Sequence, residues 1–290
     1  MSQVLFCRDP LNPRRVDAHF APEAEAVREL GGTVALLDHD ALLAGDARDA
    51  VARVPRDLGP VWYRGWMIPE QRYAELATAL AARGTPLRVS ADEYRCAHEL
   101  PYWYPEFEAV TAASRWLAAE PGEVPTAEEL ARLASTLPAG PGVVKDWVKS
   151  RKHEWDTAAY VPDLADTPGL RRVVARMMEL QDEFLAGGVA LRAWEHYTGP
   201  EVRVWWLAGE PVLHTPHPDA ADPAVPTPPL DQLRDPVARL GCPFITTDVA
   251  RRADGTWRLI EVGDAQVSDR HPSVPPRALA TLLLTPPTDG

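Results

Sequence analysis

The order in which strand-like and helix-like segments follow one another limits the fold of this chain more than any other feature. In the first third, short apolar runs alternate with segments of helical spacing, and these runs lie at residues 3–7, 33–38, 60–65 and 85–90. Parallel strands need such crossover segments between them, so the alternation predicts a small parallel sheet. Beyond residue 140, strand-like runs follow one another across short turns, which predicts antiparallel pairs. The sequence therefore predicts an N-terminal βα domain followed by an α+β region.

Proline and glycine divide the chain further. A helical pattern runs from residue 105 to 137, and the stretch from Thr126 to Glu129 has the form of a capping box. The run "PAGPG" at 138–142 interrupts this pattern. We therefore predict three parts, which are an N-terminal βα domain at 1–104, a helical connection at 105–140 and a third region at 141–290.

The third region contains most of the predicted antiparallel strands. An amphipathic helix is expected from Thr167, as its cap, to Gly187, and a second helix from about 230 to 240. Between these helices, the proline-rich stretch 216–229 is expected to be a surface loop. Strand-like runs lie at residues 142–148, 189–197, 201–209, 210–215, 244–251 and 256–264, with a tight turn expected at Gly209-Glu210.

Two carboxylates stand out on the last pair of strands. The strand period places Phe244, Thr246 and Asp248 on one face, and Leu259, Glu261 and Gly263 on one face of the next strand. If the hairpin turns about Asp254-Gly255, Asp248 and Glu261 lie near each other. Two such carboxylates repel unless a cation lies between them, and Mg²⁺ prefers oxygen ligands. The alternative is a hairpin whose acidic side chains face solvent.

A group of cations forms the second candidate site. Lys145 ends an apolar strand-like run, and four basic or imidazole side chains follow it, namely Lys149, Arg151, Lys152 and His153. Cations at a strand end can neutralise phosphate groups. The alternative is a solvated surface run. On another strand, Glu201 and Arg203 share one face, either as site residues or as a surface ion pair.

Composition excludes several classes of function. The chain of 290 residues carries 42 acidic and 30 basic side chains, for a formal net charge of −12, which argues against a nucleic-acid-binding surface. We expect no membrane partner, because no apolar run approaches the length of a spanning helix. Three dispersed cysteines and the lack of a signal-peptide pattern favour the cytoplasm. His214 and His217 lie in a proline-rich stretch without neighbouring ligands, so a metal site is not expected there.

The order of these features resembles the ATP-grasp superfamily, and within it the clade named for one arginine and two lysines. The resemblance rests on a lysine-bearing strand, a helix, a strand ending in "WEHY", a strand with "ExR", and acidic residues on a final hairpin. It extends back through "YRGWMIPEQRYAELATAL" and "SADEYRCAHELPYWYP". The fold that it implies is an N-terminal βα pre-domain followed by two α+β subdomains that enclose a nucleotide.

The resemblance also implies a role for each candidate residue, with ATP and Mg²⁺ as cofactors. It assigns the phosphate contacts to Lys145 and to Lys149 or Lys152, and it implies that Arg203 faces the reacting phosphoryl group or the acyl phosphate. Trp194 and Glu195 lie at the linker that holds adenine, and Glu201 lies nearer the ribose. Asp248 and Glu261 bind Mg²⁺. The family's usual asparagine is replaced by Gly263, so Asp264 or Gln266 is expected to take its place, or one ligand is missing.

A second departure concerns the loop after Lys145. No glycine occurs between Gly142 and Gly169, so the phosphate-covering loop is expected to use side chains rather than backbone amides. Arg64 follows a strand of the predicted parallel sheet, which is a usual place for a ligand contact, and we expect it to touch the other substrate.

The implied activity is that of an ATP-dependent ligase, which activates a carboxylate as an acyl phosphate for attack by an amine. The partner is expected to be a small molecule or peptide with a carboxylate, and the sequence does not specify an oligomeric state. A phosphotransferase and a degenerate protein that only binds a ligand are the alternatives.

Overall fold

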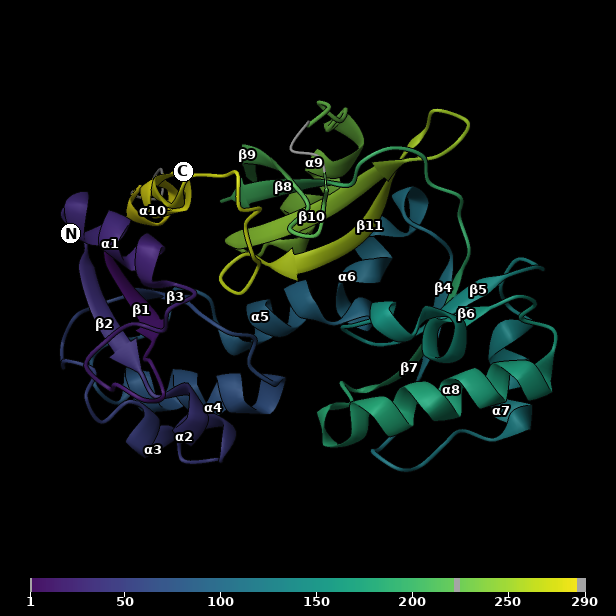
Figure 1. The fold of residues 1–290 in the computed structure, drawn as a ribbon, viewed down its shortest axis with the longest axis horizontal. Coiled ribbons are helices and arrows are strands. Elements are labelled where there is room, and N and C mark those ends of the chain that lie inside the picture. The colour runs from purple at the N-terminus through teal and green to yellow at the C-terminus, as the bar shows by residue number, and fades with distance from the viewer. Residues whose placement is uncertain (1, 222–224, 286–290) are drawn as a thin grey trace.

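The computed structural model of the chain describes residues 2–221 and 225–285, which form three sheets (Figure 1). Residues 222–224 of the expected surface loop lie outside this description. One sheet is parallel and the other two are antiparallel. The predicted combination of a βα domain with α+β subdomains is confirmed.

The parallel sheet has the order β2-β1-β3. Its central strand, with the sequence "QVLFC", is buried along nearly its whole length, as expected for a strand covered on both faces. Figure 1 shows α1 on one side of this sheet and α2, α3 and α4 on the other. The bounds of these elements are β1 (Gln3–Cys7), α1 (Ala21–Glu29), β2 (Thr33–Leu37), α2 (His39–Leu43), α3 (Ala47–Ala50), β3 (Val61–Arg64) and α4 (Glu70–Ala81).

The prediction of a fourth strand in this sheet, at residues 85–90, is wrong. Only Leu87 forms a bridge there, to Val61 of β3. The covering helix beside α1 comes instead from residues far along the chain, namely α10 (Pro276–Leu284). Leu279, Ala280 and Leu283 of this helix belong to the same apolar core as β1 (Figure 1).

A second sheet has the order β4-β7-β5-β6 and packs against α7 and α8. Its strand β4 corrects the helical expectation for 105–137, because residues 114–118 pair with β7. The predicted capping box of Thr126 and Glu129 is confirmed at the start of α7. Helix α8 is capped by Asp166 rather than Thr167, and it ends at Gln181, before Gly187. The bounds are β4 (Ser114–Ala118), α7 (Ala127–Ala134), β5 (Gly142–Asp146), β6 (Tyr160–Val161), α8 (Thr167–Gln181) and β7 (Gly188–Ala193).

The third sheet has the order β11-β10-β8-β9 and rests on α5, α6 and α9. The turn between β8 and β9 is formed by Ala208 and Gly209, one residue earlier than expected, and both have positive φ, as a two-residue hairpin turn requires. The bounds are α5 (Ala91–His98), α6 (Leu100–Phe107), β8 (Val202–Leu207), β9 (Glu210–Pro216), α9 (Asp231–Leu240), β10 (Phe244–Arg251) and β11 (Trp257–Asp264). Short helical turns complete the chain at Glu108–Val110, Lys152–Glu154, Trp155–Ala159 and Asp182–Phe184.

A β-bulge changes the expected faces of the last hairpin. Asp248 pairs with Glu261, as predicted, but Val249 pairs with Leu259, so Ile260 has no partner on β10. The extra residue breaks the period of two. As a result, Leu259 lies in the apolar core beneath the sheet and does not share a face with Glu261.

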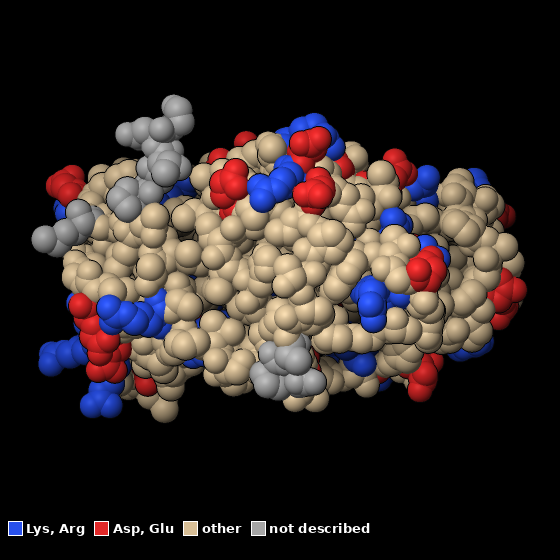
Figure 2. Space-filling view, turned by 90° about the horizontal axis from the view of Figure 1, so that it is seen from above, with Lys and Arg blue, Asp and Glu red and all other residues tan. Residues whose placement is uncertain are grey.

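The described surface carries both signs of charge. On the face shown in Figure 2, acidic and basic side chains are interspersed, and the basic ones form no continuous patch there. None of the helices described by the structure is both long enough and apolar enough to span a membrane.

Candidate active site

A cavity of about 470 Å³ lies where the two antiparallel sheets approach the N-terminal domain. The loop after β5 supplies one wall, at residues 148–154, and the hairpin of β10 and β11 with the loop after it supplies another. The first hundred residues contribute only Met67 and His98 to the described lining. The candidate residues that line the cavity are Lys149, Lys152, Arg203, Asp248, Glu261 and Asp264.

Arg203 and Asp248 form a buried ion pair at the floor of the cavity. Their strands are hydrogen-bonded neighbours, and the register places the two residues directly opposite each other. Arg203 donates from Nε and Nη2 to the two carboxylate oxygens, at 2.8 and 2.7 Å, and from Nη1 to the carbonyl of Asp269. Such a two-bonded pair fixes the guanidinium plane as well as its charge.

Glu261 has a separate cationic partner. Lys145 of β5 donates from Nζ to Glu261 Oε1 at 3.0 Å and to the carbonyl of Val148. Burial by itself would raise the pKa of Glu261, but the charge and hydrogen bond of Lys145, with Lys152 and Arg203, lower it to about 2. The repulsion expected between Asp248 and Glu261 is therefore offset in this structure by one cation on each carboxylate.

A third carboxylate and an imidazole lie beside Asp248. Glu201, His217 and Asp248 each offer a ligand atom, and these atoms all lie within 4.8 Å of one another. Burial, reinforced by the negative charge of Asp248, raises the pKa of Glu201 to about 8. His217 is buried, and burial lowers its pKa. The sequence interpretation that His217 lacks neighbouring ligands is thus wrong, because strand pairing supplies them.

The loop after β5 is organised by a side chain. Asp146 accepts hydrogen bonds from the amides of Val148 and Lys149, and its other oxygen faces Gln181. These amides are therefore occupied within the protein, and the loop presents side chains to the cavity. Lys149 is exposed, and Lys152 lies 3.8 Å from Asp219 across the cavity. Arg151 pairs instead with Glu154 of the same loop.

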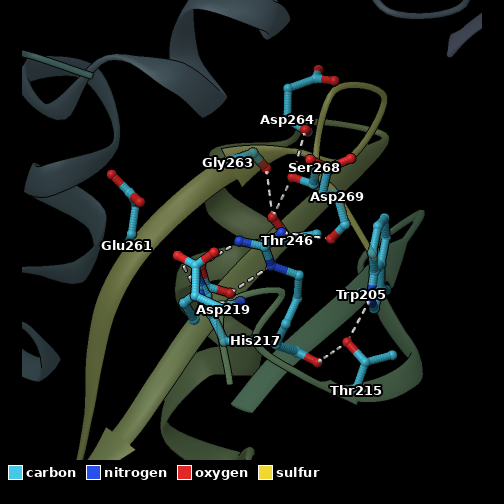
Figure 3. Close-up of polar contacts among 12 residues, drawn as sticks. Trp205, Thr215, His217, Asp219, Thr246, Glu261, Gly263, Asp264, Ser268 and Asp269 are labelled. Carbon is cyan, nitrogen blue, oxygen red and sulfur yellow. Dashed lines mark hydrogen bonds and ion pairs between the residues drawn. The ribbon is translucent and has the colours of Figure 1, made fainter. Parts of the chain in front are cut away.

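Asp264 and Gln266 form contacts inside the protein. Asp264 Oδ1 accepts the amide of Gln266 at 2.8 Å, and the Gln266 side chain contacts Tyr63 and Tyr73 of the N-terminal domain. Burial raises the pKa of Asp264 to about 7. In Figure 3, the side chain of Asp264 points away from His217 and Asp219.

Gly263 lies next to a hydrogen bond between β10 and the loop that follows β11. Thr246 and Ser268 are linked through their hydroxyls at 2.8 Å, and a Cβ on Gly263 would lie 3.1 and 3.3 Å from these two oxygens (Figure 3). A longer side chain at this position therefore requires the two hydroxyl groups to move.

Five candidates lie outside the described lining of the cavity, namely Lys145 and Glu201, described above, and Trp194, Glu195 and Arg64. Trp194 donates its backbone N–H to the carbonyl of Pro141, and its ring contacts Trp155 and Tyr160. Glu195 forms an ion pair with Arg258 at 3.1 Å. Arg64 is buried, and its guanidinium is hydrogen-bonded to Glu23 and to the carbonyls of Gln266 and Ser268.

His98 lines the cavity without having been a sequence candidate. Its Nδ1 is buried and has no hydrogen-bond partner among the described residues. Burial lowers the pKa of His98 to about 4, and the charge of Lys149 acts in the same direction, so the ring is neutral near pH 7. No local pattern marks this residue, because it ends a helix that the tertiary fold brings to the cavity.

The carboxylates of this site fit a divalent cation. Asp248 and Glu261 provide oxygen atoms opposite each other across the hairpin, which is the donor type that Mg²⁺ prefers. Lysine and arginine side chains around the same cavity provide positive charge for an anionic ligand.

Comparisons with known proteins agree with this architecture. The matching family model describes an ATP-grasp domain, family 3 of the clade named for one arginine and two lysines, and it covers residues 136–283, which is 148 of 290 residues. No curated protein matches the chain.

Solved structures resemble nearly the whole chain at low sequence identity. The D-cycloserine synthetase DcsG is 19% identical, with 97% of this chain and 100% of that chain covered and a TM-score of 0.59. The ATP-grasp ligase PsnB, complexed with minimal precursor, Mg and ADP, is 14% identical, with coverages of 97% and 96% and a TM-score of 0.56. D-alanine–D-alanine ligase from Bacillus anthracis, complexed with ATP, is 13% identical, with coverages of 97% and 91% and a TM-score of 0.54.

These structures share the fold, and the family model covers just over half of the chain, including β5, β8, β10 and β11 with the ion pairs described above. The chain belongs to the ATP-grasp superfamily, in family 3 of the clade named for one arginine and two lysines.

Proposed function

We propose that this protein is an ATP-dependent ligase that activates a carboxylate as an acyl phosphate and joins it to an amine. The cavity supports this function because cations from two sheets surround a pair of facing carboxylates. Arg203 lies on the floor, Lys149 and Lys152 lie on the opposite wall, and Asp248 and Glu261 lie between them. This arrangement suits phosphoryl transfer, in which catalysis depends mainly on positioning and on charge stabilisation.

The reaction has two steps. A carboxylate oxygen of the substrate attacks the γ-phosphorus of ATP, the bond to the ADP oxygen breaks, and an acyl phosphate forms. The amine nitrogen then attacks the carbonyl carbon, inorganic phosphate leaves, and the nitrogen loses a proton to solvent. Bringing the reacting groups together supplies much of the rate enhancement in such reactions.

Each candidate residue has a proposed role in these steps. Lys145, Lys149 and Lys152 bind phosphate oxygens, and Arg203 stabilises charge on the transferred phosphoryl group. Asp248 and Glu261 would hold Mg²⁺, which neutralises phosphate charge when bound. Asp264 is the proposed substitute ligand, although its hydrogen bonds to Gln266 favour a structural role.

The nucleotide base is proposed to lie near residues 194–197, with Glu201 nearer the ribose. The Trp194 amide already donates to Pro141, so other backbone groups of this segment would contact adenine. The proposed carboxylate substrate is a small molecule or a peptide, since structures of similar fold include a D-cycloserine synthetase and a ligase complexed with a minimal precursor. Arg64, with its buried contacts, is at most an indirect contributor to substrate binding.

Substrate-dependent release of ADP tests the proposal. Pools of carboxylates, peptides and amines are supplied with ATP and Mg²⁺, and the ligase predicts ADP and phosphate in equal amounts only when both substrates are present. Arg203→Met should lower the rate by at least about a hundredfold. Arg251→Met, which changes an exposed arginine at the end of β10, the strand paired with β8, is the matched control. A stable phosphorylated product would indicate a phosphotransferase, and binding of ATP without turnover would indicate a ligand-binding protein.

A further inference from the structure

Glu201, His217 and Asp248 come from three neighbouring segments of one sheet. Glu201 directly precedes β8, His217 directly follows β9, and Asp248 lies in β10, on the other side of β8. The amide of His217 donates to the carbonyl of Glu201 at 3.1 Å, which continues the strand pairing by one residue. His217 Nε2 lies 3.8 Å from Asp248 Oδ2. Sheet pairing therefore holds the three side chains together.

The donor set of this cluster differs from the pair of carboxylates across the hairpin. Two carboxylates and an imidazole suit borderline divalent cations, whereas Mg²⁺ prefers oxygen ligands alone. We propose that Glu201, His217 and Asp248 form a binding site for a transition-metal dication of the Mn²⁺ to Zn²⁺ class. His217 and Asp248 line the cavity, so the ion has a path from solvent.

A carboxylate lies close enough to His217 to become, after a small shift, the acceptor that a metal-bound imidazole needs. Its Nδ1 lies 3.2 Å from the amide of Asp219, from which it accepts a hydrogen bond, and 3.8 Å from the Asp219 carboxylate. When Nε2 binds a metal, Nδ1 must carry the proton and needs an acceptor. The Asp219 side chain is 75% exposed, so a shift of about 1 Å lets its carboxylate become that acceptor. Figure 3 shows Asp219 beside His217.

The ion pair of Asp248 is compatible with the proposed ion. Each carboxylate oxygen has two lone pairs, so Oδ2 accepts the hydrogen bond from Arg203 and binds a cation at the same time. Glu261 takes no part in this cluster, since its partner is Lys145 on the other antiparallel sheet.

Binding of Mn²⁺ alone tests the site without any nucleotide. Electron spin echo modulation of Mn²⁺ added to the full chain is expected to show coupling to a nitrogen nucleus, and calorimetry is expected to rank the affinities as Zn²⁺ above Mn²⁺ above Mg²⁺. His217→Asn should abolish the nitrogen coupling and weaken Mn²⁺ binding by at least about tenfold. Asparagine places its oxygen near the position of Nδ1, so it keeps an acceptor for the Asp219 amide and removes only Nε2.

Two further variants separate the possible outcomes. His214→Asn, on β9, changes a histidine outside the cluster and should leave the coupling and the affinity unchanged. Glu261→Gln should also leave the nitrogen coupling unchanged, because Glu261 is not part of the cluster. Absence of nitrogen coupling in the wild type, or a loss of Mn²⁺ affinity in Glu261→Gln but not in His217→Asn, would overturn the proposal. Thermal unfolding of each variant checks that it is folded, and no outcome depends on the proposed ligase activity.

Discussion

Glu201 is a carboxylate whose negative charge is disfavoured by the folded structure. Its pKa is raised to about 8, so the folded protein keeps this proton at pH values where the unfolded chain, with a pKa near 4.5, has lost it. The folded state then binds more protons than the unfolded state, and stability falls as the pH rises from about 4.5 to 8. Loss of the proton from Glu201 thus makes the metal-free protein less stable at alkaline pH.

Glu201→Gln removes this pH dependence, because an amide does not titrate. The variant should be more stable than the wild type by about 1–3 kcal/mol at pH 9 and nearly equal to it at pH 4. Urea unfolding at the two pH values, with a chelator present, measures the difference. Equal slopes of stability against pH in both proteins would mean that Glu201 is not the group responsible.

Glu261 and Asp264 are two carboxylates of one strand with different surroundings. Both line the cavity, but Glu261 accepts a hydrogen bond from Lys145, whereas Asp264 is hydrogen-bonded to the backbone and side chain of Gln266. Glu261→Gln should therefore raise the Mg²⁺ concentration needed for ATP turnover at least about tenfold, while Asp264→Asn should mainly lower the melting temperature. Titration of Mg²⁺ in the turnover assay decides between them. An equal loss in both variants would make Asp264 a ligand, and no loss in either would remove the metal from this strand.

At the scale of elements, Arg64 joins strand β3 to the loop after β11. Its guanidinium is almost completely buried, and it donates to Glu23 of α1 and to the carbonyls of Gln266 and Ser268. Arg64→Met leaves Glu23 buried with one cation fewer, and it should destabilise the protein by about 3–5 kcal/mol. The double variant Arg64→Met/Glu23→Gln should recover part of this loss. Urea unfolding measures both, and a single variant of wild-type stability would contradict the structural role.

The hairpin of β10 and β11 was predictable because its signals are local. Alternating residues and the Asp254-Gly255 turn fix the register that brings Asp248 opposite Glu261. The bulge at Ile260 was not predictable, because a period of two gives no sign of where an extra residue is inserted. Strand β4 was missed for a different reason, since its partner β7 lies about seventy residues further along the chain.

The candidate site follows the same division between local and distant signals. Lys145, Arg203 and Asp248 were selected as candidate site residues from their positions on predicted strands and from the family resemblance. The ion pair between Lys145 and Glu261 was not predictable, because the two residues are 116 positions apart and lie in different sheets. His217 and His98 were missed, since each gains its surroundings only when the sheet or the helix is in place.

At the scale of the whole molecule, the ion pair between Lys145 and Glu261 connects the two antiparallel sheets. In the proposed function, a nucleotide phosphate that binds Lys145 would compete with this pair and would release Glu261 for a cation. Lys145→Met should weaken ADP binding by about 1.5–3 kcal/mol, the range for a hydrogen bond to a charged group. Calorimetric titration measures it, and unchanged affinity would exclude Lys145 from the nucleotide site.

A double variant separates binding from stability in this experiment. Lys145→Met leaves Glu261 without its partner and should lower stability, whereas Lys145→Met/Glu261→Gln should restore stability but not ADP affinity. Recovery of affinity in the double variant would mean that Lys145 acts only by holding Glu261.

The helix that covers one side of the parallel sheet reaches it from the far part of the chain. Residues of α10 pack with β1 and α1 in one core, and Ser2 donates to the carbonyl of Leu284. During synthesis on the ribosome, β1, β2 and β3 therefore emerge some two hundred residues before the helix that shields them. Until then, the apolar face that receives Leu279 and Leu283 stays open to water, and we expect the nascent first domain to be prone to aggregation during this interval.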